Sequence, residues 1–333
     1  MLLTRRRTLA TAAAAALLSL AAACGGGGGE GGDAGGTTAV QVGALSNGAA
    51  KETTLDVATV ESIRAELPAQ VRDAGVLNVG LGLLPAGSPP LGYTGTDDKT
   101  LTGAEPDYAR LVGAVLGLKV ELNNATWQNL FVGIDSGRTD VGFSNITVTE
   151  ERKKKYDFAT YRLDNLAFET LASKTFAFTG DPQVLAGKKI YVGAGTNQER
   201  ILLQWQSQLR GQGKNFDVVY FPDSSAVTLA LESGKIDAAF EPNPSAAYHV
   251  TQSAGTPNPK AVAGTYSGAG SSLQGLIAAT SKKDSGLAKP IADATNHLIQ
   301  NGQYEQWLRA WNLSNEAVKT SQVNPPGLPI TNS

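Results

Sequence analysis

The body of the chain alternates short apolar runs with longer segments of helical periodicity, and this alternation limits the folds that it can adopt. The predicted strands are VLNVGLG (76–82), LKVELNN (118–124) and TDVGFSN (139–145). Helices that end at glycine are expected between them, over 106–117 and 127–137. Because a helix between consecutive strands allows them to pair in parallel, the pattern predicts an α/β sheet.

A second cycle of the same pattern begins near Leu166. Strands are expected over 188–195, 216–221 and 235–241, and helices over 198–209 and 225–233. The chain then returns to a strand over 275–281 and to a helix over 287–300 with an apolar face. The two cycles predict two α/β lobes, with the second lobe inserted within the first.

The first residues are typical of an export signal. A basic cluster, Arg5 to Arg7, precedes an apolar run that ends at Cys24. That run is shorter than the roughly 20 apolar residues that span a membrane. LAAAC (20–24) resembles a bacterial lipoprotein signal, which implies cleavage after residue 23 and a lipid on the Cys24 thiol. A conventional signal with an unmodified cysteine is the alternative.

TRRRTL (4–9) also resembles a twin-arginine export signal, so the general secretory and twin-arginine routes both stay open. Residues 24–54 are rich in glycine and small polar residues, and we expect them to form a flexible tether. These segments predict a lipid-anchored protein outside the cytoplasm, in the periplasm or on the cell surface. The membrane contact would be made through the lipid.

The charge and the side-chain chemistry argue against several function classes. The formal net charge is −2, and a mildly acidic chain is a poor partner for nucleic acid. The single cysteine, Cys24, leaves none for a disulfide or a cysteine metal site. His249 and His297 lie far apart in the sequence without metal-ligand spacing, so we expect no metal and no cofactor.

Five motifs follow one another in an order that points to one family. They are VLNVGLG…SPPL, LTGAEPDYARLVGAVLG, TWQNLFVGIDSGRTDVGFSNITVTEERKKKYDF, LAGKKIYVGAGTNQE and LESGKIDAAF. Together they resemble family 3 bacterial solute-binding proteins, the amino-acid receptors of ATP-driven importers, over about residues 70–312. The resemblance implies a two-lobed, periplasmic-binding-protein-like fold of type II. Two crossover strands act as hinges, and the ligand lies in the cleft between the lobes.

Carried onto this sequence, the resemblance predicts how the chain divides. Lobe one comprises residues 55–164 and 274–318, and lobe two comprises residues 167–270. Residues 319–333 form a C-terminal tail.

The resemblance also predicts ligand contacts in SNITVTEER, which spans Ser144 to Arg152. Ser144 and Asn145 are expected in the cleft, and the hydroxyl of Thr147 is expected to bind the ligand ammonium. Arg152 is expected to pair with the ligand α-carboxylate, because its planar fork offers a carboxylate two parallel hydrogen bonds. Without the resemblance, Arg152 reads as the start of a solvated basic turn, since three lysines follow it.

In lobe two, GAGTNQE (193–199) resembles the glycine-threonine loop with which the family enters a helix. Backbone N–H groups at a helix N-terminus attract anions, so Thr196 and Asn197 are expected near a ligand carboxylate oxygen. The family more often has a hydroxyl residue where this chain has Asn197. That difference leaves the side-chain contact open and keeps the backbone contact.

Leu91 and Trp127 are expected to form walls of the cleft. The family commonly has an aromatic residue at the position of Leu91, and Tyr93 could substitute for it. For Trp127, simple packing of its helix is the alternative.

The largest departure from the family lies after the KIDAAF motif. Members that bind α-amino acids usually place an aspartate where this chain has Pro242, and that aspartate neutralises the ligand ammonium. A buried ammonium without a partner costs several kcal/mol, so the site must compensate. Either Glu241 takes over the charge, or the ligand lacks an α-ammonium group.

These features predict a monomeric receptor that delivers a small, amino-acid-like ligand to ABC permease subunits and performs no chemistry. A dehydratase-type enzyme on the same fold is one alternative; it would need a positioned acid or base, for which Glu199 and Glu241 are the candidates. A receptor that reports the ligand to a membrane sensor is the other. The sequence leaves the ligand open among amino acids, amines and small carboxylates.

Overall fold

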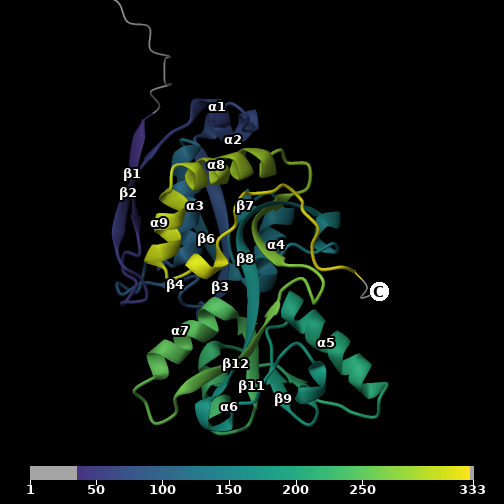
Figure 1. Cartoon of the computed structure of the whole chain (residues 1–333). Helices are drawn as coiled ribbons and strands as arrows, with labels where there is room; N and C mark the ends of the chain where they lie inside the picture. The colour runs from purple at the N-terminus through teal and green to yellow at the C-terminus, as the bar shows by residue number, and fades with distance from the viewer. Residues whose placement is uncertain (1–35, 331–333) are drawn as a thin grey trace, which may run out of the picture. The chain divides into compact units, whose positions relative to one another are not determined.

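The computed structural model describes residues 36–330, and its central feature is a sheet shared by two groups of elements (Figure 1). The strands pair in the order β10-β9-β11-β8-β13-β7-β3-β6, and β12 also pairs with β8. They are β3 (Val76–Leu84), β6 (Lys119–Thr126), β7 (Val141–Gly142), β8 (Tyr156–Leu171), β9 (Lys189–Tyr191), β10 (Asp217–Val219), β11 (Ala238–Pro242), β12 (Lys260–Ser267) and β13 (Gly275–Lys282). The expected signal peptide, Cys24 and the start of the tether lie outside the described residues.

Strand β8 belongs to both halves of the sheet. Its first part, up to Asp164, pairs antiparallel with β13, and its second part, from Asn165, pairs with β11 and β12. In the first half β3 pairs parallel with β6 and β7, and in the second half β9 pairs parallel with β10 and β11. The expected α/β architecture with two lobes is therefore present, and β8 and the passage from β12 to β13 connect the lobes (Figure 1).

Helices flank both halves of the sheet. Lobe one carries α1 (Glu61–Arg64), α2 (Ala69–Ala74), α3 (Ala104–Val115), α4 (Trp127–Asp135), α8 (Ala288–Gln300) and α9 (Gln303–Ala310), and lobe two carries α5 (Asn197–Arg210), α6 (Ser224–Glu232) and α7 (Asn243–Ser253). Short 3₁₀ turns cover Arg152–Lys154, Ala172–Lys174, Pro182–Leu185 and Ser314–Glu316. Side chains of Thr126, Thr196 and Asp223 accept hydrogen bonds from the first turns of α4, α5 and α6. These residues fix where the helices next to the lobe junction begin.

Each lobe has its own apolar core. In lobe one, the Tyr108 ring on α3 lies 4.2 Å from the Trp307 ring on α9 and 4.9 Å from the Tyr161 ring on β8, measured between centroids. In lobe two, Phe168 on β8 stacks on Phe240 of β11 at 4.3 Å. Alternate residues of β8 thus anchor it in both cores, which holds this connection firmly at its two ends.

The expected flexible tether over 24–54 is wrong for residues 37–54. Thr37–Val42 forms β1, which pairs antiparallel with β2 (Thr53–Ala58) and packs beside α3. Val40 and Val42 are buried in the lobe-one core together with two apolar residues of β2. The segment has few large apolar residues, but Val40 and Val42 occupy alternate positions of β1, so both point to the same face of the hairpin.

The segment after residue 318, expected as a C-terminal tail, contacts both lobes. Val323 pairs with Ala159 of β8, and Leu328 pairs with Thr149 in lobe one. The Leu328 side chain is buried in the lobe-two core, and Arg200 on α5 donates a hydrogen bond to the carbonyl oxygen of Pro329. We call residues 319–330 the C-terminal strap.

The described part of the chain contains no candidate for a membrane-spanning helix. Over residues 36–330, every helix is too short or too polar to cross a bilayer.

Candidate functional site

A cavity of about 280 Å³ lies at the junction of the two lobes. This volume is close to the lower end for small-molecule pockets, so it suits a ligand of amino-acid size. Lobe one contributes residues 82–88, Leu91, Glu105, Trp127, Ser144 and Asn145, and lobe two contributes Glu169, His249 and residues from the segments 191–198, 222–228 and 240–242.

Most of the residues predicted from the sequence meet at this cavity. Its lining includes Leu91, Trp127, Ser144, Asn145, Thr196, Asn197 and Glu241. Tyr93, Thr147 and Arg152 are not among the described residues that line it. A contact with a ligand stays a prediction for every one of these side chains.

Tyr93 lies in the lobe-one core, away from the expected cleft wall. Its strand, β4 (Tyr93–Thr94), pairs with β5 (Leu101–Thr102). The hydroxyl donates to the carbonyl oxygen of Ser46 at 2.7 Å, and the ring lies edge-on to Trp311 at 6.5 Å. Tyr93 therefore holds the N-terminal hairpin region against the lobe and does not replace an aromatic wall beside Leu91.

Arg152 and Thr147 make contacts within the protein. The Arg152 Nη1 donates to the carbonyl oxygen of Thr147 at 2.9 Å, and the guanidinium lies 5.3 Å from the Trp127 ring centroid. Burial lowers the pKa of Arg152 to about 10, so the group still carries its charge at neutral pH. The Thr147 hydroxyl donates to Asp164 Oδ2 at 2.7 Å.

The loop after β7 presents Ser144 and Asn145 to the cavity. Ser144 Oγ accepts a hydrogen bond from the backbone N–H of Gly82 at 2.9 Å, which ties the loop to β3. Asn145 has a positive φ of 52°, a conformation that asparagine tolerates better than most residues. Its Oδ1 accepts from Arg162 Nη2 at 2.6 Å, and its N–H donates to Glu105 at 3.1 Å. This network fixes one wall of the cavity.

The start of α5 forms the opposite wall. Thr196 caps the helix by accepting from the Glu199 N–H at 3.2 Å, and its hydroxyl donates to the carbonyl oxygen of Gly193 at 2.7 Å. Across the lobe junction, Trp127 Nε1 donates to the carbonyl oxygen of Gly195 at 3.2 Å. The two lobes therefore contact each other beside the cavity.

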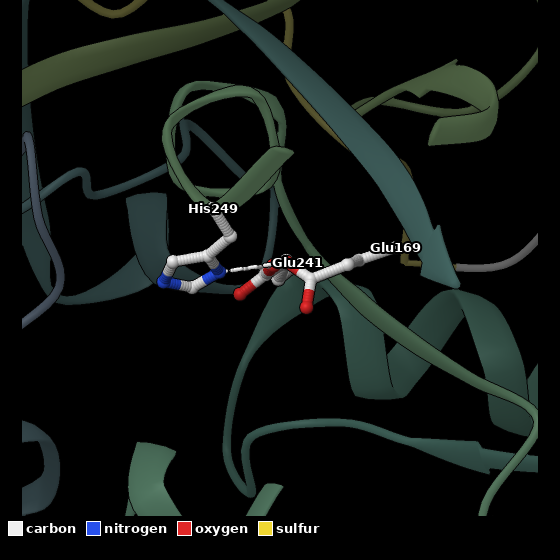
Figure 2. Close-up of side chains that lie close together, drawn as sticks. All are labelled: Glu169, Glu241 and His249. Carbon is white, nitrogen blue, oxygen red and sulfur yellow. Dashed lines mark hydrogen bonds and ion pairs between the residues drawn. The ribbon is translucent and has the colours of Figure 1, made fainter. Parts of the chain in front are cut away.

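Sequence reasoning missed a cluster of ionisable groups at the lobe-two end of the cavity. Figure 2 shows Glu169 of β8, Glu241 of β11 and His249 of α7 converging from three elements. His249 Nδ1 donates to Glu169 at 2.6 Å and lies 3.4 Å from Glu241 Oε1. Lys260 Nζ lies 2.7 Å from the other Glu169 oxygen. Glu241 Oε1 is buried and accepts no hydrogen bond within the described structure.

The three groups differ in protonation because their surroundings differ. Burial, then the charge of Glu169, raises the pKa of Glu241 to about 7. Burial also opposes ionisation of Glu169 and His249, but their mutual hydrogen bond and attraction outweigh it. The pKa of Glu169 falls to about 2, and the pKa of His249 rises to about 10. At neutral pH an imidazolium thus lies between one ionised and one partly protonated carboxylate.

By spacing alone, this cluster could hold a divalent cation, since one ligand atom from each group lies within 4.8 Å of the others. A divalent cation held by all three groups would have to displace the proton of His249. It would also be repelled by Lys260, which already neutralises Glu169. The arrangement is better explained as an ion-pair network. No local sequence pattern indicates this network, because Glu169 and His249 are 80 residues apart.

The same framework is found in known proteins. The family model for bacterial extracellular solute-binding proteins, family 3, matches residues 83–314. The chain belongs to that family. Residues 83–314 include lobe two, most of lobe one and most segments that line the cavity.

Among curated relatives, the L-cystine-binding protein TcyJ of Escherichia coli K12 is 35% identical over 171 residues, which cover 51% of this chain and 59% of TcyJ. The match therefore spans less than two thirds of that relative. The arginine-binding protein ArgT of Corynebacterium glutamicum is 23% identical over 267 residues, or 80% of this chain and 83% of ArgT.

Solved structures share the fold. An ancestral arginine-binding protein bound to arginine superposes with a TM-score of 0.60 at 26% identity, over 71% of this chain and 98% of that one. The ancestral amino-acid-binding protein AncCDT-1, a precursor of cyclohexadienyl dehydratase, gives a TM-score of 0.60 at 22% identity, over 73% of this chain and 97% of that one. The fold is that of two-lobed type II periplasmic binding proteins, and the solved structures that share it include a precursor of an enzyme as well as binding proteins.

Proposed function

We propose that this protein is a receptor outside the cytoplasm that binds a small, amino-acid-like solute between its lobes and delivers it to the permease of an ATP-driven importer. The observation that carries the proposal is the cavity at the lobe junction, which is lined from both lobes at positions that the resemblance predicts. The names of the relatives, an L-cystine-binding and an arginine-binding protein, support a ligand of this size and polarity.

The arrangement of the lobes supports binding by enclosure. Hydrogen bonds from Trp127 to Gly195 and between Ser88 and Ser245, at 3.2 and 2.8 Å, close the junction on two sides of the cavity. A hinge motion along β8 and the β12 to β13 passage would break these bonds and admit the solute. Closure would then remove it from water, which strengthens its polar contacts.

We propose binding without chemistry. Glu199, one candidate for a catalytic acid, accepts hydrogen bonds from the Tyr220 hydroxyl at 2.6 Å and from the Gly195 N–H at 2.7 Å, and its own N–H donates to Thr196, the cap of α5. Glu241, the other candidate, belongs to the ion-pair network with His249. We further propose that the protein acts as a monomer and is held at the membrane by a lipid on Cys24.

A thermal-shift screen of amino acids, amines and small carboxylates tests the binding function. A ligand at 100 times its dissociation constant adds about 2.7 kcal/mol of stability, which shifts the melting temperature by several degrees. The hit should lose its effect in Trp127→Ala, which removes a cavity wall. The same compound should still stabilise Val132→Ala, because Val132 is exposed on the same helix. A hit that stabilises both variants equally would place its site elsewhere.

A further inference from the structure

One buried carboxylate fastens the two lobes at the hinge. Asp164 is the last residue of β8 that pairs with β13, and its side chain is buried. Its Oδ2 accepts hydrogen bonds from the Thr147 hydroxyl at 2.7 Å and from Asn197 Nδ2 at 3.2 Å. Thr147 belongs to lobe one and Asn197 to lobe two, so a single oxygen is shared between the lobes.

The backbone leaves a space for this carboxylate. A Cβ at Gly268 would lie 1.7 Å from Asp164 Oδ2, so a side chain at position 268 is excluded while the carboxylate stays there. The Gly268 N–H also donates to the Asp164 carbonyl oxygen at 3.0 Å, and the Gly268 carbonyl oxygen accepts from Asn197 Nδ2 at 3.1 Å. The returning hinge segment is therefore shaped around Asp164.

The arginines near this point serve groups of the protein itself. Arg152 is close enough for its positive charge to favour the ionised form of Asp164, against the burial that raises the pKa of that carboxyl. Arg162 is buried between Glu105, at 2.7 Å, and Glu316. Thr147 and Asn197, which were expected to contact a ligand zwitterion, thus donate to a carboxylate that the chain supplies, and the charge of Arg152, the third expected contact, favours the ionised form of that carboxylate.

The cavity itself favours a cation. The described residues that line it include the carboxylates of Glu105, Glu169, Asp223 and Glu241, one imidazole, and no lysine or arginine. Arg162 pairs with Glu105, Lys260 pairs with Glu169, and the Ala226 N–H donates to Asp223. Among the described residues, Glu241 Oε1 is the lining carboxylate oxygen that is buried and accepts no hydrogen bond, and its nearest cationic neighbour, His249 Nδ1, lies 3.4 Å away. A ligand ammonium would supply that donor, and a ligand carboxylate would meet negative charge.

We propose that Asp164 takes the place of a ligand carboxylate, so that the cavity binds a small organic amine with no carboxylate of its own and holds its ammonium against Glu241. This inference rests on the proposed binding function and names the class of its ligand. The ligand is then the decarboxylated counterpart of an amino acid, an amine with a short apolar or hydrogen-bonding body. Trp127, Leu91 and Tyr191 supply the walls for that body.

Calorimetry of the full chain with matched pairs tests the ligand class. The pairs are arginine with agmatine, lysine with cadaverine, histidine with histamine, and cystine with cystamine. We expect at least one amine to bind, and to bind at least about tenfold more tightly than its amino acid. If each amino acid that binds does so more tightly than its amine, the inference is overturned while the proposed function stands. If none of these compounds binds, the inference is also overturned, and the wider screen decides the proposed function separately.

Variants of Asp164 test the second half of the inference. Asp164→Ala vacates the space between Thr147 and Asn197. The affinity for the amino acid should therefore rise at least about tenfold relative to the affinity for its amine. Asp157→Ala, on the same strand but bonded to residues 284 and 324, is the matched control and should leave the ratio unchanged. An unchanged ratio in Asp164→Ala would contradict the substitution of a ligand carboxylate by Asp164.

A readout without any ligand covers the case in which Asp164→Ala is poorly stable. Sodium acetate should enter the vacated space and raise the melting temperature of Asp164→Ala, relative to sodium chloride of equal ionic strength. Wild type and Asp157→Ala should respond to the two salts alike. If Asp164→Ala does not fold, Asp164→Asn keeps the shape without the charge and should shift the binding ratio in the same direction. Equal responses of all variants to acetate and chloride would overturn the assignment.

Discussion

At Glu241, burial and a neighbouring carboxylate keep a proton that an exposed glutamate would lose. The pKa of this group rises to about 7 from an ordinary value of 4.5. Its Oε1 accepts no hydrogen bond in the described structure, although His249 Nδ1 lies 3.4 Å away, so an arriving ammonium would supply the missing donor. Binding of a cation should then release a proton from the site near neutral pH, because the ionised form pairs with the cation.

The raised pKa of Glu241 predicts a pH dependence of stability. Between about pH 4.5 and 7 the folded protein holds a proton that the unfolded chain has lost, so this stabilising contribution is complete below pH 4.5 and lost as the pH rises through 7. The melting temperature should fall less between pH 5 and pH 8 in Glu241→Gln than in the wild type, by a few degrees. This difference corresponds to about 1 to 2 kcal/mol in the free energy of unfolding. Glu316, whose pKa burial also raises to about 7, leaves a residual slope in both proteins.

Thermal unfolding of the empty protein at several pH values checks this expectation. Glu232→Gln changes an exposed glutamate on α6 and should follow the wild type. A wild-type slope retained in full by Glu241→Gln would show that Glu241 is ionised at pH 5.

Glu241→Gln should also weaken the binding of an amine. The change removes a charge-assisted contact, and we expect a loss of about 2 kcal/mol, roughly thirtyfold in the dissociation constant. Calorimetry with the tightest amine, with Glu232→Gln as the control, measures the effect. An unaltered affinity would mean that the ammonium lies elsewhere in the cavity.

At the scale of elements, periodicity predicted much of the framework. The strand expected over 118–124 is β6 at Lys119–Thr126, and the helix expected over 127–137 is α4 at Trp127–Asp135. Helix α7 and strand β12 were not predicted. α7 begins at Asn243, directly after Pro242, and Pro244 lies in its first turn, where a proline loses no hydrogen bond.

That omission explains why part of the site stayed hidden. α7 carries His249 and β12 begins at Lys260, so without them Glu169 has no visible partner in the sequence. The lobe-one wall was easier, because Trp127, Ser144 and Asn145 lie in motifs with local signatures. Asp164 was missed for a different reason: the two donors to its side chain, Thr147 and Asn197, come from separate segments, and no local pattern connects them.

The N-terminal hairpin gives an element-scale prediction. Val42 is fully buried against the lobe-one core, so Val42→Ala should lower the free energy of unfolding by about 2 kcal/mol. Gln41→Ala, at the adjacent exposed position of β1, is the control and should change it by less than about 0.5 kcal/mol. Denaturant unfolding decides between them. Equal stabilities of the two variants would support the original expectation of a tether here.

At the scale of the whole molecule, the membrane attachment is a prediction about residues outside the described range. If Cys24 carries the lipid, Cys24→Ala should move the protein from the membrane fraction to the soluble fraction and leave ligand affinity unchanged. Fractionation followed by calorimetry measures both. Continued sedimentation of Cys24→Ala with membranes would point to another attachment.

The C-terminal strap is expected to affect the equilibrium between open and closed forms of the empty receptor. Because residues 319–330 contact both lobes, we expect opening of the junction to detach some of them, and we expect the strap to favour closed forms of the empty protein. The apparent affinity of a ligand depends on the fraction of molecules that can admit and hold it. A residue far from the cavity can therefore tune uptake: Leu328→Ala should widen the open population, seen as a larger radius of gyration in X-ray scattering without ligand and the wild-type value at saturation. If Leu328→Ala and the wild type have the same radius of gyration without ligand as well as at saturation, the strap moves with the lobes and does not bias them. If the strap does bias the empty protein, residues 319–330 determine what fraction of receptors can admit a ligand, and the cavity determines which ligand binds.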